Sequence, residues 1–245
     1  MNICFVANYN KTYFFNEVAK RISSKSDVYW IAVNKKIAEY LVALYGEANV
    51  LYLPKSVGRL SPRERLDDYK ITELIAGDRI LRLDYEEGYK YLSNIQKHIV
   101  EFITGKKIKL IFGELTWAHE LLIKRISLKN EKLECNYINP HTVRIPNGRF
   151  AFFKDEFQCQ LVDLGQESQG FPEELFVPQK PDYLRLNDQI LKKKSSIVGR
   201  AQRFKRFLTG ENLDKEDPTL PKRMSWSRIT IPFKEEINRF IYQFV

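Results

Sequence analysis

The run Asn2-Ile-Cys-Phe-Val-Ala-Asn-Tyr-Asn10 decides how this chain is expected to fold. Its first six residues, up to Ala7, are mostly apolar, and the polar residues Asn8-Tyr-Asn10 end the run. A short apolar run bounded by turn-forming residues is typical of a fully buried β-strand. We therefore expect a buried first strand with polar side chains at its carboxyl end.

Strands and helices alternate after this first strand. Apolar residues recur at helical spacing, for example at Phe14, Val18 and Ile22, and apolar runs between the helices predict further strands. The expected strands cover 27–33, 50–53, 107–112 and 133–137, and the expected helices cover 12–22, 36–45, 69–75, 87–104 and 116–126.

This alternation predicts the α/β class, with a parallel sheet covered by helices on both faces. We expect a Rossmann-like open parallel sheet with the strand order 3-2-1-4-5, whose switch point lies between the first and fourth strands. The alternation weakens after Phe153, although 157–162 is compatible with a sixth strand. We divide the chain into a Rossmann-like domain, 1–163, and an irregular and helical C-terminal extension, 164–245, which packs on that domain or leads to a second one.

Composition limits the class of protein and its partners. The 245 residues are 44% hydrophobic and 29% charged, with a net charge of +9. This charge suggests an anionic partner, such as nucleic acid, a phospholipid surface, or a phosphorylated or acidic sugar, and a solvated basic surface is the alternative. The N-terminus lacks the basic region of a signal peptide, so we expect a cytoplasmic location. Three widely spaced cysteines predict neither a disulfide framework nor a zinc site, and we expect no metal.

Ligands of open α/β sheets bind outside the carboxyl ends of the strands. The expected strand order places Asn8, Tyr9 and Asn10 beside Glu114 and Thr116 at the mouth of one crevice. Glu114 is a candidate general base, although a Glu there also stabilises the N-terminus of the following helix. His119, one turn into that helix, is a second candidate base or a hydrogen-bond donor to a phosphate. The alternative is that it packs in the core.

A second polar group follows the expected fifth strand. His141 comes directly after Asn139-Pro140, and Pro140 stiffens a turn in a way that suits a positioned ligand contact. Arg144 and Arg149 flank the turn signal Pro146-Asn-Gly148. Two guanidinium groups on one turn suit bidentate binding of a carboxylate or phosphate, and solvated arginines on a hairpin are the alternative.

A basic amphipathic helix is expected near residue 200. Such a helix is typical of contact with an anionic membrane surface, or it packs its apolar side on the domain and leaves the charges in water. Nucleic-acid binding is disfavoured because the aromatic residues are not interleaved with this basic run in the way that a base-stacking platform needs. The basic residues are Lys192, Lys193, Lys194, Arg200, Arg203, Lys205 and Arg206.

Some nucleotide-binding and hydrolase signatures are absent from the sequence. The turn after the first strand has no glycine, which excludes the dinucleotide fingerprint. No GxxxxGK[ST] loop and no GxSxG elbow occur anywhere in the chain.

Two motifs carry a family resemblance. They are Gly113-Glu-Leu-Thr-Trp-Ala-His-Glu120, and Asn139-Pro-His-Thr-Val-Arg-Ile-Pro-Asn-Gly-Arg-Phe-Ala-Phe-Phe153 followed by Asp155-Glu156. These motifs resemble bacterial capsule and surface-polysaccharide biosynthesis proteins, which are similar to glycosyltransferases of the GT-B architecture. The resemblance covers about residues 1–160 and is clearest from 113 to 158.

The resemblance implies a glycosyltransferase whose first domain holds a saccharide or lipid-linked acceptor. It implies no cofactor, with a nucleotide-sugar as co-substrate on a second domain. The chain ends near the expected start of that domain, so activity would need a further domain or a partner subunit. Glu114 would be the base, His119 the second candidate, and His141, Arg144 and Arg149 would orient an acidic or phosphorylated acceptor.

The alternative is a non-catalytic module that binds an anionic glycan or a lipid-linked sugar. In both cases the basic helix adds the option of peripheral contact with the inner membrane.

Overall fold

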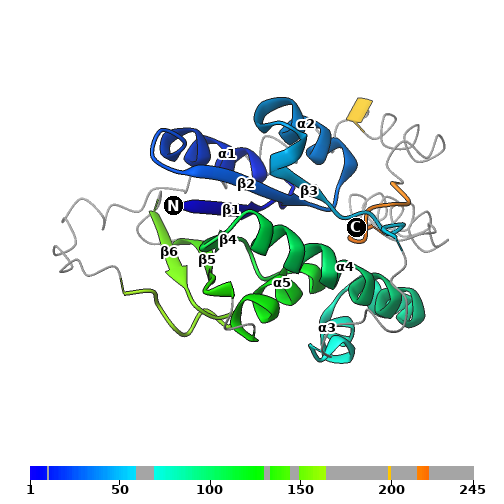
Figure 1. The fold of residues 1–245 in the computed structure, drawn as a ribbon. Coiled ribbons are helices and arrows are strands. Elements are labelled where there is room, and N and C mark those ends of the chain that lie inside the picture. The colour runs from blue at the N-terminus through cyan, green and yellow to red at the C-terminus, as the bar shows by residue number, and fades with distance from the viewer. Residues whose placement is uncertain are drawn as a thin grey trace, which may run out of the picture.

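The strands form one six-stranded sheet in the computed structural model, in the order β3-β2-β1-β4-β5-β6 (Figure 1). The structure describes residues 1–9, 11–58, 69–129, 133–143, 149–163, 198–199 and 214–220, and every structural statement below refers to these. The strands are β1 (Asn2–Val6), β2 (Asp27–Ala32), β3 (Val50–Tyr52), β4 (Leu110–Phe112), β5 (Asn136–Val143) and β6 (Arg149–Phe153).

The first five strands are parallel and lie in the predicted order 3-2-1-4-5. The prediction of an entirely parallel sheet is wrong at one edge, where β6 pairs antiparallel with β5. Residues 144–148 are too few for a parallel crossover, which needs a dozen residues or more, so β6 returns as a hairpin partner. The sixth strand thus precedes 157–162, where Leu161 forms an isolated bridge with Phe153.

Helices cover both faces of the sheet, as predicted, because successive strand residues face opposite sides. On β1, Phe5 packs with the helices α1 and α2, whereas Cys4 and Val6 pack with α3, α4 and α5 (Figure 1). The helices are α1 (Lys11–Ile22), α2 (Lys35–Tyr45), α3 (Ile71–Gly77), α4 (Tyr85–Gly105) and α5 (Ala118–Lys129), with short 3-10 turns η1 (Glu47–Asn49) and η3 (Leu81–Leu83).

β5 begins later and runs further than the predicted 133–137. It continues through Pro140, which the sequence suggested would stiffen a turn. The Ile138 carbonyl accepts a hydrogen bond from the Gly113 N–H on the β4 side, and backbone groups two residues apart face the same side. Pro140, which has no N–H, therefore lies beyond the end of β4, where no neighbouring strand would accept a hydrogen bond from it.

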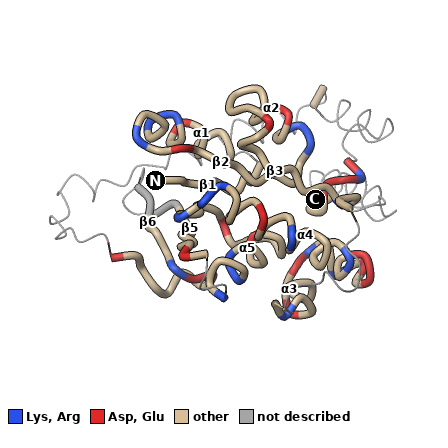
Figure 2. Tube along the Cα trace, in the orientation of Figure 1, with Lys and Arg blue, Asp and Glu red and all other residues tan. Residues whose placement is uncertain are grey.

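Several expectations concern parts of the chain outside the described residues. The basic run Lys192–Arg206 and nearly all of the extension 164–245 belong there, although 214–220 is described. Among described residues, no helix has the length and apolar character to cross a membrane. Charges of both signs are interspersed along the helices (Figure 2). Cys4 and Cys135 are buried and unpaired, as expected for core residues, and Cys159 is exposed.

Gly113 follows β4 at a point where no side chain fits. A Cβ atom there would clash with the Tyr137 hydroxyl and would lie 2.9 Å from the Val6 Cβ. The Tyr137 hydroxyl also donates to the Glu114 carbonyl at 2.9 Å, so it is not free to move away. Gly113 thus allows β1, β4 and β5 to approach closely at the edge where their carboxyl ends meet.

We expect Gly113→Ala to lower the free energy of unfolding by about 1–3 kcal/mol, as overpacking in a core does. Denaturant titration of the full chain measures this change. Gly105→Ala is the matched control, because a Cβ at Gly105 meets no atom within 4 Å. Equal stability of the two variants would contradict the close approach at Gly113.

Candidate functional site

Asn8 connects two carboxylates at the carboxyl ends of β1 and β4. Its Nδ2 donates to Glu114 Oε2 at 2.9 Å and to Glu120 Oε1 at 2.9 Å. The sequence predicted Asn8 and Glu114 at one crevice, and the structure confirms that they lie together. Their roles in binding or catalysis stay predictions.

Glu120 is the buried member of this pair, and the sequence did not single it out. Its side chain is 0% exposed, and its Oε2 accepts hydrogen bonds from the N–H groups of Thr116 at 2.7 Å and Trp117 at 2.9 Å. Burial raises the pKa of Glu120 to about 7, although these hydrogen bonds and Lys11 act in the opposite direction. A Glu at the third position of a helix is a signal for capping, but not for burial.

Lys11 supplies the positive charge of the site. Its Nζ forms an ion pair with Glu114, whose side chain is 12% exposed. Burial lowers the pKa of Lys11, and the Glu120 carboxylate opposes this shift. When Glu120 holds a proton, the charges of Lys11 and Glu114 balance; when Glu120 loses it, the cluster becomes negative. We refer to Asn8, Lys11, Glu114 and Glu120 as the switch-point cluster.

The N-terminus of α5 is already occupied by carboxylates. Glu120 accepts the N–H groups of Thr116 and Trp117, which directly precede α5, and the N–H of its first residue, Ala118, donates to Asp78 Oδ2 at 2.9 Å. These three donors are not available to a ligand phosphate. The N-terminus of α5 therefore does not favour a bound phosphate to which His119 could donate a hydrogen bond.

His119 lies in the core, one of the alternatives that the sequence left open. It is 2% exposed, and burial lowers its pKa to about 4, although Asp78 acts in the opposite direction. The imidazole is therefore neutral near pH 7. Its Nε2 has no hydrogen-bond partner among the described residues, and the side chain lines a pocket beside the switch-point cluster.

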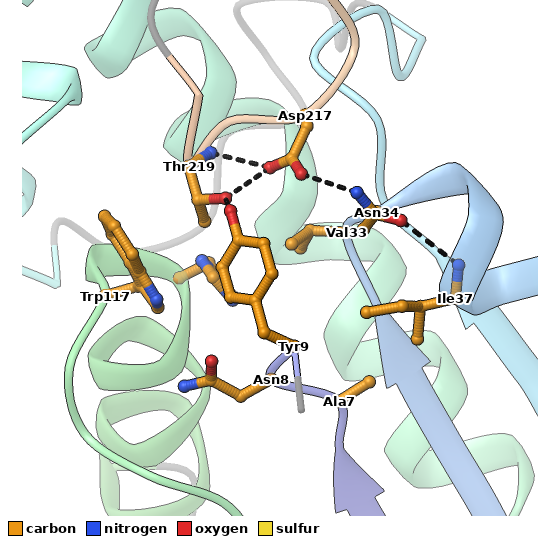
Figure 3. A pocket seen from close by; sticks show the side chains of 10 residues that line it. Ala7, Asn8, Tyr9, Val33, Asn34, Ile37, Trp117, Asp217 and Thr219 are labelled. Atoms are coloured by element: carbon orange, nitrogen blue, oxygen red, sulfur yellow. Dashed lines mark hydrogen bonds between the residues drawn. The ribbon is translucent and has the colours of Figure 1, made fainter. Parts of the chain in front are cut away.

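This pocket lies between the ends of β1 and β2 and the start of α5, and a remote segment closes it (Figure 3). We call residues 214–220, Asp-Lys-Glu-Asp-Pro-Thr-Leu, the strap. The cavity that remains measures about 10 Å³, which is room for roughly one water molecule. Its lining residues are Ala7, Asn8, Tyr9, Val33, Asn34, Ile37, Trp117, His119, Asp217 and Thr219.

The strap is hydrogen-bonded to the pocket wall (Figure 3). Asn34 Nδ2 donates to Asp217 Oδ2 at 2.8 Å, while Asn34 Oδ1 caps α2 by accepting from the Ile37 N–H at 3.1 Å. The Tyr9 and Thr219 hydroxyls are hydrogen-bonded to each other. Asn34 is fixed by its capping role, so its amide presents a positioned donor to the crevice.

Other predicted site residues lie apart from the pocket or outside the described residues. His141 belongs to β5 and pairs with Ala151 of β6, so its placement in a turn is wrong, and it does not line the pocket. The Thr116 side chain is exposed. Arg149 is on β6, whereas Asn10 and Arg144 fall outside the described residues. A site shared by Glu114, His141 and Arg144 stays a prediction, because Arg144 lies outside the described residues.

Several residues of the site were missed by sequence reasoning. Asn34 follows β2 and precedes a helix, so its place at a strand end was a usable signal. No sequence signal indicated Asp217 and Thr219, because they belong to a segment that is far in the sequence from the other residues of the pocket.

No family model matches the chain, and neither curated proteins nor solved structures gave a significant match. The function is therefore argued from the site itself.

Glu120 should make stability depend on pH. Its folded pKa of about 7 exceeds the unfolded value of 4.5, so the folded state binds more protons between these values. This contribution is complete below the unfolded pKa and is lost as the pH rises through about 7. We expect wild type to lose on the order of 1–3 kcal/mol relative to Glu120→Gln between pH 5 and 8.

Chemical denaturation of both proteins across this range measures the difference. Comparing the two cancels the contribution of His119, whose lowered pKa acts with the opposite sign. A difference that does not change with pH would show that Glu120 is ionised throughout.

Proposed function

We propose that this chain is the acceptor-side domain of a GT-B-like glycosyltransferase of bacterial surface-polysaccharide synthesis. In this proposal the sheet is a Rossmann-like domain, and a sugar passes from a nucleotide-sugar to an acceptor hydroxyl in the crevice. The observation that carries the proposal is the bridge from Asn8 to both Glu114 and Glu120 at the β1–β4 switch point. The motif resemblance of residues 113–120 and 139–156 supports the same class.

The crevice has the groups that recognise a sugar. Carboxylates accept hydrogen bonds from hydroxyl groups, and an amide both donates and accepts. Trp117 lines the pocket beside them, and the Arg79 guanidinium lies 4.8 Å from its ring centroid. Aromatic walls combined with a few positioned polar groups are typical of small-molecule sites.

Glu114 is the carboxylate that a substrate can reach, since Glu120 is fully buried. In the proposed reaction the acceptor hydroxyl transfers its proton to Glu114 as its oxygen attacks the anomeric carbon, and the nucleotide leaves with the bonding electrons. Glu120 holds Asn8 in place, and Lys11 stabilises the ionised form of Glu114. The donor would bind on a second domain or a partner subunit.

The alternative function is a non-catalytic module for an anionic glycan or a lipid-linked sugar. The small cavity bears on both functions alike, because neither a reacting sugar nor a bound one has room while the strap is in place. In either case we propose a cytoplasmic location, in which the basic run Lys192–Arg206 contacts anionic lipid headgroups.

Turnover tests the proposal. This chain, together with the domain or partner subunit that binds the donor, is incubated with UDP-, GDP-, dTDP- and CMP-sugars and a panel of methyl glycosides as acceptors, and nucleotide release is measured. We expect Glu114→Gln to reduce acceptor-dependent release about 10²–10⁴-fold, the usual contribution of a general base.

Glu134→Gln is the matched control. Glu134 is also paired with a lysine, Lys109 at 2.6 Å, but it lies near the other end of β4 and is 75% exposed. Equal rates for Glu114→Gln and wild type would remove the base role. Glycoside binding by NMR that Glu114→Gln abolishes, without nucleotide release, would favour the binding module.

A further inference from the structure

We propose that the strap is a displaceable occupant of the crevice, and that its Asp217 carboxylate and Thr219 hydroxyl take the place of the same two groups on an acidic sugar. This inference rests on the proposed carbohydrate function and narrows its ligand to a uronic-acid class. It also makes the strap an internal competitor of that ligand.

The strap fills the place where a ligand would bind in an open α/β sheet. Asp217, Pro218 and Thr219 are buried, and side-chain hydrogen bonds join Thr219 to Tyr9 after β1 and Asp217 to Asn34 after β2. With the strap seated, the cavity admits nothing larger than about one water molecule. A sugar ring therefore binds here only if the strap leaves.

The chemistry of the strap indicates the chemistry of the ligand. Asn34 Nδ2 donates to a carboxylate oxygen of Asp217, and the Tyr9 hydroxyl pairs with the Thr219 hydroxyl. Asp217 Oδ1 also accepts from Thr219 Oγ1 at 2.5 Å, so the two groups lie side by side. A uronic acid presents a ring carboxylate next to a hydroxyl in a comparable way, and the same donors can bind it.

The docked strap leaves polar groups of the pocket without full hydrogen-bond or ion-pair partners, and this favours its displacement by a ligand. Asp217 is 0% exposed, yet it forms no ion pair with the described residues and relies on neutral donors. A buried carboxylate without a cation is costly. His119 Nε2 lines the same pocket and has no hydrogen-bond partner among the described residues, so a ligand with an additional hydroxyl gains a hydrogen bond that the strap does not make.

Contacts outside the pocket hold the strap as well, and they allow a test that leaves the lining residues unchanged. The Lys55 N–H donates to the Glu216 carbonyl at 2.8 Å, and Lys55 Nζ donates to the Leu220 carbonyl at 2.9 Å. The Ser56 N–H donates to Glu216 Oε2 at 2.9 Å. We call Lys55, Ser56 and Glu216 the outer clamp.

Two clamp variants with opposite charge changes separate strap release from electrostatics. Lys55→Met removes a positive charge and Glu216→Ala a negative one, and each weakens the clamp. The probes are methyl β-D-glucuronide and methyl β-D-glucoside, which share a ring and differ in the carboxylate. NMR titration gives the Kd values, and hydrogen exchange at the Lys55 and Ser56 amides reports whether the strap is docked.

We expect both variants to bind the glucuronide about 2–10-fold more tightly than wild type, the range for loss of one competing hydrogen bond. We also expect the glucuronide to bind more tightly than the glucoside, and to accelerate exchange of both amides in wild type. Lys215→Ala, at an exposed strap residue, should leave the affinity unchanged.

The outcomes that overturn the inference are distinct from those that overturn the function. Glucuronide binding with unchanged amide exchange, or with affinity unchanged or weakened in both variants, would make the strap a fixed wall and leave the proposed function standing. Equal affinity for the glucoside would remove the acidic-sugar preference alone. Failure of every glycoside in the panel to bind wild type or either clamp variant would remove both proposals.

Discussion

The site depends on one side-chain amide that donates both of its hydrogens to carboxylates. Asn8 joins Glu114, after β4, to Glu120, inside α5, and thereby ties the end of the central strand to the start of a helix. Two carboxylates this close would repel each other if both were ionised in a dry environment. The structure resolves the conflict by raising the pKa of one to about 7 through burial and by pairing the other with Lys11.

This arrangement is possible because the backbones approach closely beneath it. Gly113 lets the ends of β1, β4 and β5 converge without a side chain between them. The helices on the two faces keep the strands in register, and α5 is held through Asp78, whose carboxylate binds the Ala118 N–H. Close approach places the polar groups together, and the surrounding core excludes water from Glu120 and His119.

The strap restricts the access of a ligand to the crevice. A sheet of this kind offers a ligand site at the switch point, but here a segment of the same chain lines the pocket beside it. Asn34 Nδ2 and the Tyr9 hydroxyl are engaged with Asp217 and Thr219, whereas His119 Nε2 has no hydrogen-bond partner among the described residues. The strap therefore both limits access to the pocket and occupies the hydrogen-bonding groups of Tyr9 and Asn34.

The sequence by itself determined the alternation of strands and helices, because burial on both faces requires apolar strands and amphipathic helices. The polar residues at strand ends, Asn8 and Glu114, followed from that pattern. The tertiary structure alone decided the antiparallel β6, the burial of Glu120, the course of β5 past His141 and the docking of Asp217. Each of these depends on which distant segments meet, and local periodicity carries no information about such contacts.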